Sequence, residues 1–181
     1  MTGQPARARE VVLSLGSNLG DRLANLQRGI DALMSEPGLA GAAVSGVFHT
    51  SPVGGPDQPD FLNAVMIADS TLPASQILRR CRAAERAAGR VRTVHWGPRT
   101  LDIDVIACGD EISDDPMLSL PHPRAHERAF VLVPWLDVDP GACLPGAGQV
   151  ADLLAGVGAE GVWRLAGARL SVTGPKAGGQ E

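Results

Sequence analysis

The sequence is short of residues on which several classes of protein depend. It has no tyrosine and only three cysteines among 181 residues, and fifteen of its sixteen basic residues are arginine. The three cysteines, Cys81, Cys108 and Cys143, are far apart, which predicts free thiols and gives no metal-binding spacing. The single lysine, Lys176, is not part of a GK[ST] motif, so the sequence excludes a Walker-type phosphate loop.

Long apolar runs and a secretory leader are also missing. No apolar run is long enough to cross a bilayer, and residues 1–10 contain no apolar segment followed by a cleavage site. With 44% hydrophobic and 20% charged residues, the chain has the composition of a globular protein. We therefore expect one cytoplasmic domain over residues 1–167. Residues 168–181 should form a flexible C-terminal tail, and truncation after Leu170 should leave stability and activity unchanged.

Positive charge is concentrated in one stretch of an acidic chain. Residues 79–99 contain seven arginines and one acid, a local charge of +6, whereas the whole chain carries −4. The remaining residues therefore carry −10. Such a focused basic stretch favours a compact anionic ligand, because proteins that bind nucleic acids more often present a broad basic face.

Two aspartates stand in an apolar segment that has the character of a strand, residues 101–108. Asp102 and Asp104 are spaced i,i+2, so their carboxylates should point to the same face of the strand. Aspartate is a poor strand former, and two in one strand indicate a function unless that face is simply solvated. A carboxylate pair suits Mg²⁺, which takes one or two protein carboxylates together with substrate phosphates. Two carboxylates could also bridge two ions.

The residues before this strand supply matching ligands for phosphate. Arg90, Arg92 and Arg99 precede the aspartates, and only Glu85 is an acidic neighbour in sequence. A guanidinium can donate two parallel hydrogen bonds to phosphate oxygens. Trp96 in the same loop is either an anchor folded onto the core or a cover that closes over the phosphates.

Two further places could contribute to a site. In LPHPRAHERAF, residues 120–130, His122 stands between two prolines, and a fixed imidazole near Arg128 could donate to a phosphate. Phe61 and Asn63 are spaced i,i+2 at the start of a predicted strand. An aromatic ring and an amide on one strand face can stack a flat heterocycle and recognise the donors and acceptors on its edge.

Hydrophobic periodicity predicts the order of the secondary structure. Helices are expected from about Asp21, after the cap-like Ser17 and Asn18, and from Pro73 to Gly89. Together with strands at 11–16, 42–49, 61–69 and 101–108, they give the order βαββαβ, which is typical of ferredoxin-like α+β folds. This fold has an antiparallel sheet with helices packed on one face. The C-terminal additions should be a helical turn near 124–129, a strand-like FVLVPWL segment, a helix around 149–156 and a strand near 161–166.

Four stretches of the sequence resemble the 6-hydroxymethyl-7,8-dihydropterin pyrophosphokinases of folate biosynthesis. They are LSLGSNLGDR (13–22), TSPVGGPDQPDFLNAV (50–65), GRVR with WGPRTLDIDV (89–105), and LPHPRAHERAFVLVPW (120–135). The resemblance implies a Mg²⁺-dependent enzyme that transfers pyrophosphate from ATP to the pterin hydroxyl and releases AMP. It also implies a ferredoxin-like core.

The resemblance assigns roles to individual residues. It implies that Asp102 and Asp104 hold two Mg²⁺ ions and, with Arg90 and Arg99, form the catalytic group. The implied ATP contacts are Glu85, Arg90, Arg92, Trp96, Arg99, Val105, His122 and Arg128. The implied pterin contacts are Thr50, Val53, Phe61, Asn63 and Phe130.

Without the resemblance, two other functions remain open. One is a nucleotide-sugar transferase that uses the D-x-D pair to bind its metal, and the other is a ferredoxin-like nucleotide- or RNA-binding module. Aromatic residues make up only 3% of the chain, which argues against stacking many bases. We expect a monomer that acts on two small molecules and binds neither nucleic acid nor a membrane.

Overall fold

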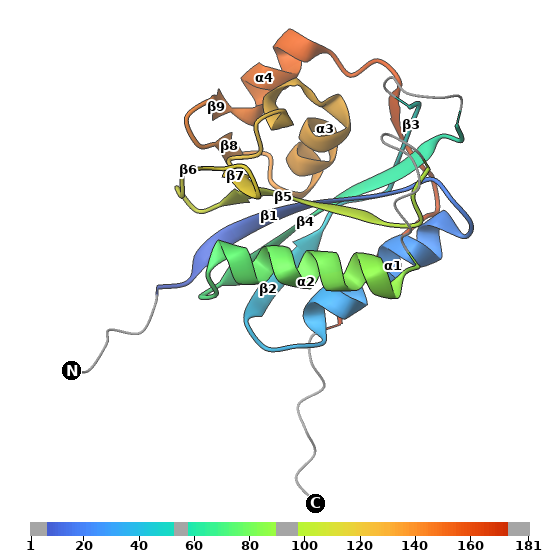
Figure 1. Cartoon of the computed structure of the whole chain (residues 1–181). Helices are drawn as coiled ribbons and strands as arrows, with labels where there is room; N and C mark the ends of the chain where they lie inside the picture. The colour runs from blue at the N-terminus through green and yellow to red at the C-terminus, as the bar shows by residue number, and fades with distance from the viewer. Residues whose placement is uncertain (1–6, 53–57, 90–97, 174–181) are drawn as a thin grey trace, which may run out of the picture.

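The structure is a computed structural model that describes residues 7–52, 58–89 and 98–173. Within these residues a six-stranded antiparallel sheet organises the chain (Figure 1). Its strand order is β10-β3-β4-β1-β5, and β2 also pairs with β4. The strands are β1 (Arg9–Ser17), β2 (Leu39–Val44), β3 (Phe48–Thr50), β4 (Phe61–Ser70), β5 (Asp102–Cys108) and β10 (Val162–Arg164).

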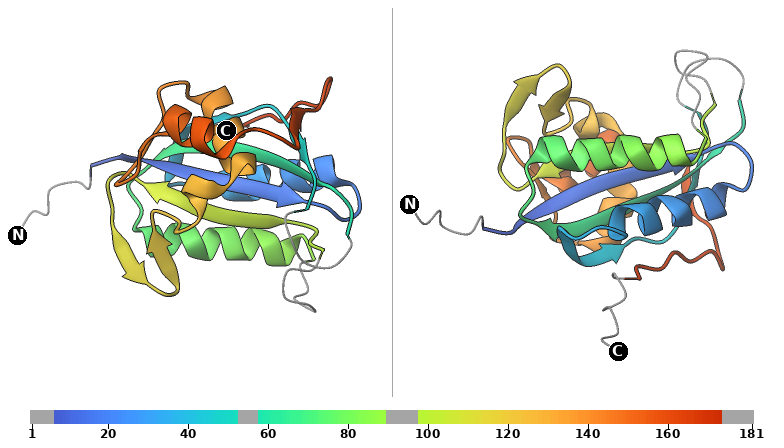
Figure 2. Two further views of the ribbon diagram at one scale, coloured as in Figure 1. Left: turned by 90° about the horizontal axis from the view of Figure 1, so that it is seen from above. Right: turned by 60° about the horizontal axis from the view of Figure 1, so that its bottom comes forward.

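The first half of the chain forms the predicted ferredoxin-like core, and this prediction is confirmed. Helices α1 (Arg22–Met34) and α2 (Ala74–Ala87) lie on one face of the sheet (Figures 1 and 2). Helix α1 begins where the Asp21 carboxylate accepts a hydrogen bond from Ala24 N–H at 3.0 Å. Residues 42–49, predicted as one strand, belong to two short strands, β2 and β3. The regular pairing with β4 is interrupted at Ser45, whose backbone N–H donates to Val65 O at 2.9 Å and whose hydroxyl accepts a hydrogen bond from Val65 N–H at 3.0 Å.

The second half of the chain, the predicted C-terminal additions, covers the opposite face of the sheet. Helices α3 (Ala129–Val138) and α4 (Val150–Val157) pack there (Figure 2). The FVLVPWL segment, predicted to be strand-like, belongs to α3. A continuous apolar run has no period that distinguishes strand from helix, and α3 is buried between the sheet and α4. None of the described helices is long and apolar enough to cross a membrane.

Short elements complete this half of the molecule. A 3-10 turn, η1 (Ala125–Glu127), leads directly into α3. Two small hairpins lie beside the helices (Figure 1). They are formed by β6 (Ser113–Asp115) with β7 (Leu118–Leu120) and by β8 (Cys143–Leu144) with β9 (Gly148–Gln149).

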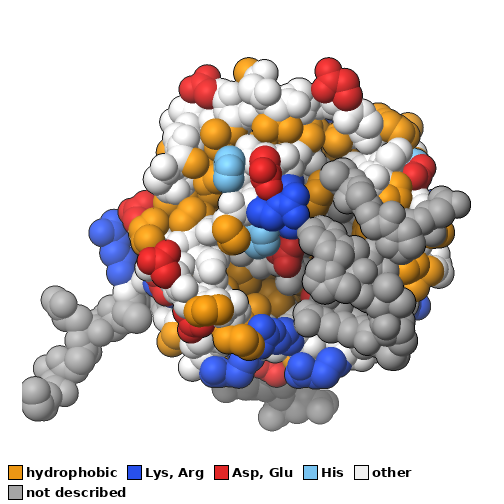
Figure 3. All heavy atoms as spheres, turned by 45° about the horizontal axis from the view of Figure 1, so that its top comes forward, with side chains coloured by type: hydrophobic (Ala, Val, Ile, Leu, Met, Phe, Trp, Pro, Cys, Tyr) orange, Lys and Arg blue, Asp and Glu red, His pale blue; other side chains and the backbone are white. Residues whose placement is uncertain are grey.

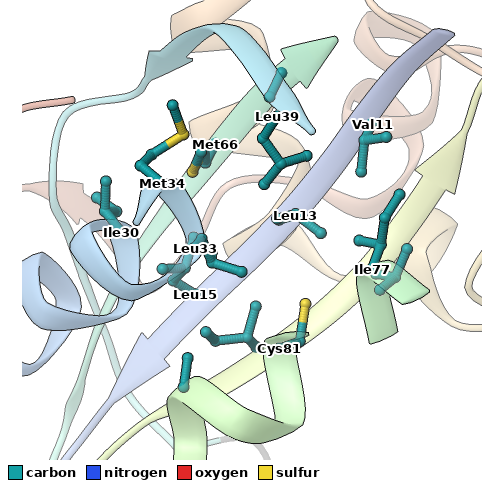
Figure 4. Close-up of a cluster of buried hydrophobic side chains, with 14 of the residues drawn as sticks. Val11, Leu13, Leu15, Ile30, Leu33, Met34, Leu39, Met66, Ile77 and Cys81 are labelled. Carbon is teal, nitrogen blue, oxygen red and sulfur yellow. The ribbon is translucent and has the colours of Figure 1, made fainter. Parts of the chain in front are cut away.

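The sheet separates two hydrophobic clusters. Side chains of β1 alternate between them, because successive strand residues point to opposite faces. Val11, Leu13 and Leu15 pack against α1 and α2 (Figure 4), whereas Val12 packs on the other side with Trp135 of α3. Further along this second side, apolar side chains give way to polar ones, and the pocket described below lies there.

The C-terminal segment differs from its prediction as a flexible tail. Ala168, Leu170 and Val172 are partly buried against the cluster beneath α1. Gln27 of α1 donates to Ser171 O and accepts from Ser171 N–H, both at 2.9 Å. The tail prediction is therefore wrong for residues 168–173, where every second residue is apolar. Residues 174–181 lie outside the described residues.

Ending the chain at Gly167 should lower the free energy of unfolding by about 1–3 kcal/mol, because packed aliphatic side chains and two hydrogen bonds are lost. Chemical denaturation of this variant measures the change. The matched control ends at Thr173, which keeps all of these contacts, and should unfold at the wild-type midpoint. Equal midpoints for both truncations would show that the docked segment contributes no stability.

Candidate active site

A pocket of about 670 Å³ opens on the α3 side of the sheet, and its size suits a small-molecule site. Residues of β1, β3, β4 and β5 line its floor, and residues of η1 and α3 line one wall. Acidic, basic and histidine side chains gather near the middle of this face of the molecule (Figure 3). The pocket brings together these predicted site residues: Thr50, Phe61, Asn63, Arg99, Asp102, Asp104, His122, Arg128 and Phe130.

Asp102 and Asp104 share the strand face that lines the pocket, and each has a guanidinium partner. Arg99 Nη1 donates to Asp102 Oδ2. Arg128 Nη1 donates to Asp104 Oδ2 at 3.4 Å. The two negative charges, which would repel each other across one strand face, are therefore balanced by two positive charges from different segments.

His122 is held as a neutral donor beside this group. Its Nδ1 accepts a hydrogen bond from Arg124 N–H at 3.2 Å, so the proton of the neutral ring is on Nε2. The Nε2 atom lies 3.9 Å from Asp104 Oδ2. Burial and, to a smaller extent, the nearby charge of Arg128 together lower the pKa of His122 to about 4. At neutral pH the ring can therefore donate from Nε2 into the pocket.

The outer edge of β5 is closed by two segments. Glu85, buried in the last turn of α2, accepts a hydrogen bond from Ile103 N–H at 2.9 Å. His122 N–H donates to Ile106 O at 2.8 Å. The helix dipole disfavours a carboxylate at the C-terminal end of a helix. The position of Glu85 is therefore explained by its hydrogen bond to the backbone of β5. Its hydrogen bond fixes the backbone between the two aspartates.

Two predicted ATP contacts do not line the pocket. The Glu85 carboxylate reaches the backbone of β5, and the Val105 side chain is buried in the cluster on the α1 and α2 side. An ATP contact for Val105 would therefore have to come from its backbone. Four other predicted site residues, Val53, Arg90, Arg92 and Trp96, lie outside the described residues.

At the other end of the pocket the floor, formed by β1, β3 and β4, is aromatic and neutral. Asn63 is buried, and its Nδ2 donates to Thr50 Oγ1 at 2.7 Å. Gly16 of β1 leaves room for this amide, since a Cβ there would lie 3.0 Å from Asn63 Oδ1 and 3.7 Å from the Phe61 ring. Phe61 lines the pocket beside them, and Phe130 lines it from α3.

Arg128 connects the charged and aromatic ends. Its guanidinium lies 5.5 Å from the centroid of the Phe130 ring while donating to Asp104. Burial lowers the pKa of Arg128 from its usual value, although Asp104 opposes the shift. One side chain therefore borders both the anionic ligands and the flat aromatic surface.

Asn18 joins the segments on either side of the pocket, a role that the sequence did not reveal. The cap role predicted for it is wrong, because α1 is capped by Asp21. Asn18 Nδ2 donates to Gln58 Oε1 and Pro59 O, both at 3.0 Å. Its Oδ1 accepts from Arg99 N–H at 2.7 Å, and its backbone N–H donates to Arg99 O at 3.1 Å.

Other pocket residues were also missed from the sequence. Arg124 and Glu127 lie in the pocket wall, where Arg124 Nε is 2.6 Å from Glu127 Oε1. Their i,i+3 spacing in PHPRAHER was a usable signal for this ion pair. Residues of the 157–162 segment also line the pocket, and no chemical motif marks them in the sequence.

Comparison with known proteins identifies the class of enzyme to which this chain belongs. The chain is 51% identical over 148 residues to the 2-amino-4-hydroxy-6-hydroxymethyldihydropteridine pyrophosphokinase of Mycobacterium tuberculosis, covering 76% of this chain and 77% of the relative. The Pseudomonas aeruginosa protein of the same name is 39% identical over 160 residues, covering 88% and 99%. The similarity to these relatives shows that the chain is a diphosphotransferase enzyme.

The family model described as 7,8-dihydro-6-hydroxymethylpterin-pyrophosphokinase (HPPK) matches residues 12–140. The chain belongs to this family, a pyrophosphokinase family of folate biosynthesis, and the resemblance seen in the sequence is confirmed. This result decides against the nucleotide-sugar transferase and the RNA-binding module.

Solved structures agree on the fold. A crystal structure of Plasmodium falciparum HPPK-DHPS with pterin and p-hydroxybenzoate superimposes with a TM-score of 0.62 at 13% identity. The match covers 86% of this chain and 42% of that one, so the chain spans about two-fifths of the larger protein. Another HPPK-DHPS structure, described as a complex with substrates, gives a TM-score of 0.61 at 10% identity.

Asn18→Ala should release the backbone at Arg99 and lower the free energy of unfolding by about 1–3 kcal/mol, since the partly buried partners of the Asn18 side chain lose their hydrogen bonds. Hydrogen exchange at the Arg99 amide is the direct measurement and should become faster. Asn18→Asp keeps the acceptor for this amide and should retain most of its protection. Unchanged exchange in Asn18→Ala would contradict the role assigned to Asn18.

Glu85→Ala should speed hydrogen exchange at the Ile103 amide and weaken nucleotide binding indirectly. Glu85→Gln keeps the acceptor oxygen and should keep both properties near those of the wild type. If both variants weakened ATP binding equally while Ile103 stayed protected, Glu85 would instead contact ATP through its charge.

Proposed function

We propose that this enzyme uses ATP as the donor and Mg²⁺ as the cofactor, and transfers pyrophosphate to the hydroxyl of 6-hydroxymethyl-7,8-dihydropterin. The products are AMP and the pterin diphosphate. One observation carries this proposal: a single pocket contains a carboxylate pair with arginines at one end and an aromatic, amide-lined surface at the other. The first end suits a metal-bound polyphosphate and the second a flat heterocycle.

The carboxylate pair fits Mg²⁺ by its donor set. Mg²⁺ prefers oxygen ligands and usually combines one or two protein carboxylates with phosphates and water. In the part of the chain that the structure describes, no group of three or more His, Cys, Asp or Glu side chains could hold a metal. We therefore propose that Asp102 and Asp104 hold two ions, with the remaining ligands from ATP and water. Mg²⁺ bound there would neutralise phosphate charge and lower the pKa of the attacking hydroxyl.

The arginine partners make cation and phosphate binding interdependent. Arg99 and Arg128 donate to the same carboxylates that would bind the cation. A cation without a polyphosphate must compete with both guanidiniums, whereas a cation with ATP gives them phosphate oxygens to bind. Arg99, Arg128 and the Nε2–H of His122 then face the charge that grows on the transferred group, where fixed donors lower the barrier most.

The neutral end is arranged to bind the pterin. Phe61 and Phe130 supply aromatic surface for the ring. Because Asn63 Nδ2 is already bound to Thr50, its Oδ1 is oriented to accept hydrogen bonds from the edge of the ring. The Thr50 hydroxyl accepts from Asn63 and can donate its own proton to a ring acceptor.

In the proposed reaction the pterin hydroxyl oxygen forms a bond to the β-phosphorus of ATP. The bond from this phosphorus to the oxygen shared with the α-phosphate breaks, and its electron pair leaves with AMP. The hydroxyl proton passes to water, and no side chain is assigned as a general base. The side chains of the protein bind the two substrates, orient them and neutralise the phosphate charge.

The test is incubation of the protein with ATP, Mg²⁺ and the pterin alcohol, followed by separation of the nucleotides and pterins. We expect AMP and pterin diphosphate in equal amounts. Release of ADP with a pterin monophosphate would contradict pyrophosphate transfer, and absence of any pterin product would contradict the substrate assignment.

Asp102→Asn and Asp104→Asn should each lower kcat by about 100-fold or more, since each removes a carboxylate proposed to bind the cation. Both variants should melt near the wild-type temperature, because the relief of like-charge repulsion on one strand face offsets the loss of one partly exposed ion pair with Arg99 or Arg128. Asp114→Asn, on the exposed hairpin, is the matched control and should keep full turnover. Near-normal kcat in either site variant would contradict the metal assignment.

A further inference from the structure

The segment between α4 and β10 lines the pocket, although it lies beyond the residues matched by the family model. The pocket is bordered by Val157 and Gly158 at the end of α4 and by Glu160, Gly161 and Val162 leading into β10. This segment forms a wall beside β3 that none of the predicted site residues includes. We call it the C-terminal wall, residues 157–162.

The C-terminal wall is connected to the sheet through β10. Strand β10 pairs with β3 over three residues, with Val162 opposite Thr50 (Figure 1). Beyond the pairing, Leu165 N–H donates to Val47 O at 2.8 Å. The strand therefore continues the same sheet that carries the pterin end of the pocket.

The strand β10, which begins at the last residue of the wall, also contacts α3 and the sheet. Arg164 Nη1 pairs with the Asp137 carboxylate at the end of this helix. The Arg164 guanidinium lies 5.7 Å from the centroid of the Phe48 ring. Asp137 Oδ2 in turn accepts from Gly46 N–H at 2.7 Å. Contacts with two separate elements give the wall a defined position.

The pairing shows which side chains face the pocket. Residues directly opposite each other in an antiparallel pair project to the same face. Val162 therefore shares a face with Thr50, whose hydroxyl accepts from the pocket residue Asn63. Trp163 projects to the other face, where its ring lies 5.0 Å from that of His49.

We infer that Val162 is a specificity-determining residue that limits the size of the heterocycle beside Thr50 and Asn63. Valine is branched at Cβ and stiff at χ1, so its methyl groups have little freedom to move aside. A larger side chain would fill the space beside the ring edge, and a smaller one would admit an extra group on the ring. The inference rests on the proposed function, because the heterocycle is the proposed pterin.

The experiment measures binding of 6-hydroxymethyl-7,8-dihydropterin by its fluorescence, in the presence of Mg²⁺ and a non-hydrolysable ATP analogue. Val162→Phe should weaken pterin binding at least tenfold while the affinity for the ATP analogue stays within twofold. Trp163→Phe is the matched control, because its side chain lies on the other face, and should bind both ligands as the wild type does.

Val162→Ala provides a second test, which does not depend on whether the Val162→Phe variant folds correctly. The ratio of its affinity for a pterin with an added ring alkyl group to that for the parent pterin should rise at least fivefold. Wild-type affinities in a folded Val162→Phe variant, or an unchanged ratio in Val162→Ala, would overturn this inference. Failure of the wild type to bind the pterin would instead overturn the proposed function.

Discussion

The placement of two carboxylates on one face of an edge strand is the constraint on which the pocket depends. Like charges at i,i+2 repel, and an edge strand has one side without a neighbouring strand to hold it. Here β1 holds the inner edge of β5, while Glu85 and the backbone of His122 bind the outer edge. The guanidiniums of Arg99 and Arg128 balance the charge. The position of Asp102 and Asp104 is therefore fixed by the neighbouring strand β1 and by four residues outside the strand, Glu85, His122, Arg99 and Arg128.

The same constraint explains why the pocket has two different ends. Charged groups gather where β5 borders the pocket, while β3 and β4 provide the neutral amide and aromatic surface on the other side of β1. Arg128 borders both, through Asp104 and the Phe130 ring. In the proposed reaction this arrangement would bring a metal-bound polyphosphate and a pterin hydroxyl together at the middle of one pocket. The C-terminal wall would close the pterin end.

Local sequence patterns predicted much of this arrangement. The i,i+2 spacing of Asp102 and Asp104, and that of Phe61 and Asn63, predicted shared strand faces because a strand has a strict two-residue period. The apolar run of α3 was misread because a continuous run of apolar residues has no period that distinguishes a helix from a strand. Asn18 and Glu85 act through hydrogen bonds to backbone atoms 41 and 18 residues away, and no local pattern encodes such contacts. The docked segment 168–173 shows the same limit, since its partner is the distant helix α1.

The central claim is that the carboxylate pair and its arginines bind a divalent cation together with a polyphosphate. Calorimetric titration with Mn²⁺, in the absence and presence of a non-hydrolysable ATP analogue, tests this claim most directly. The account predicts Mn²⁺ binding to the protein at least tenfold tighter with the analogue present, after correction for Mn²⁺ bound by the free analogue. Mn²⁺ affinity that is the same with and without the analogue would contradict it.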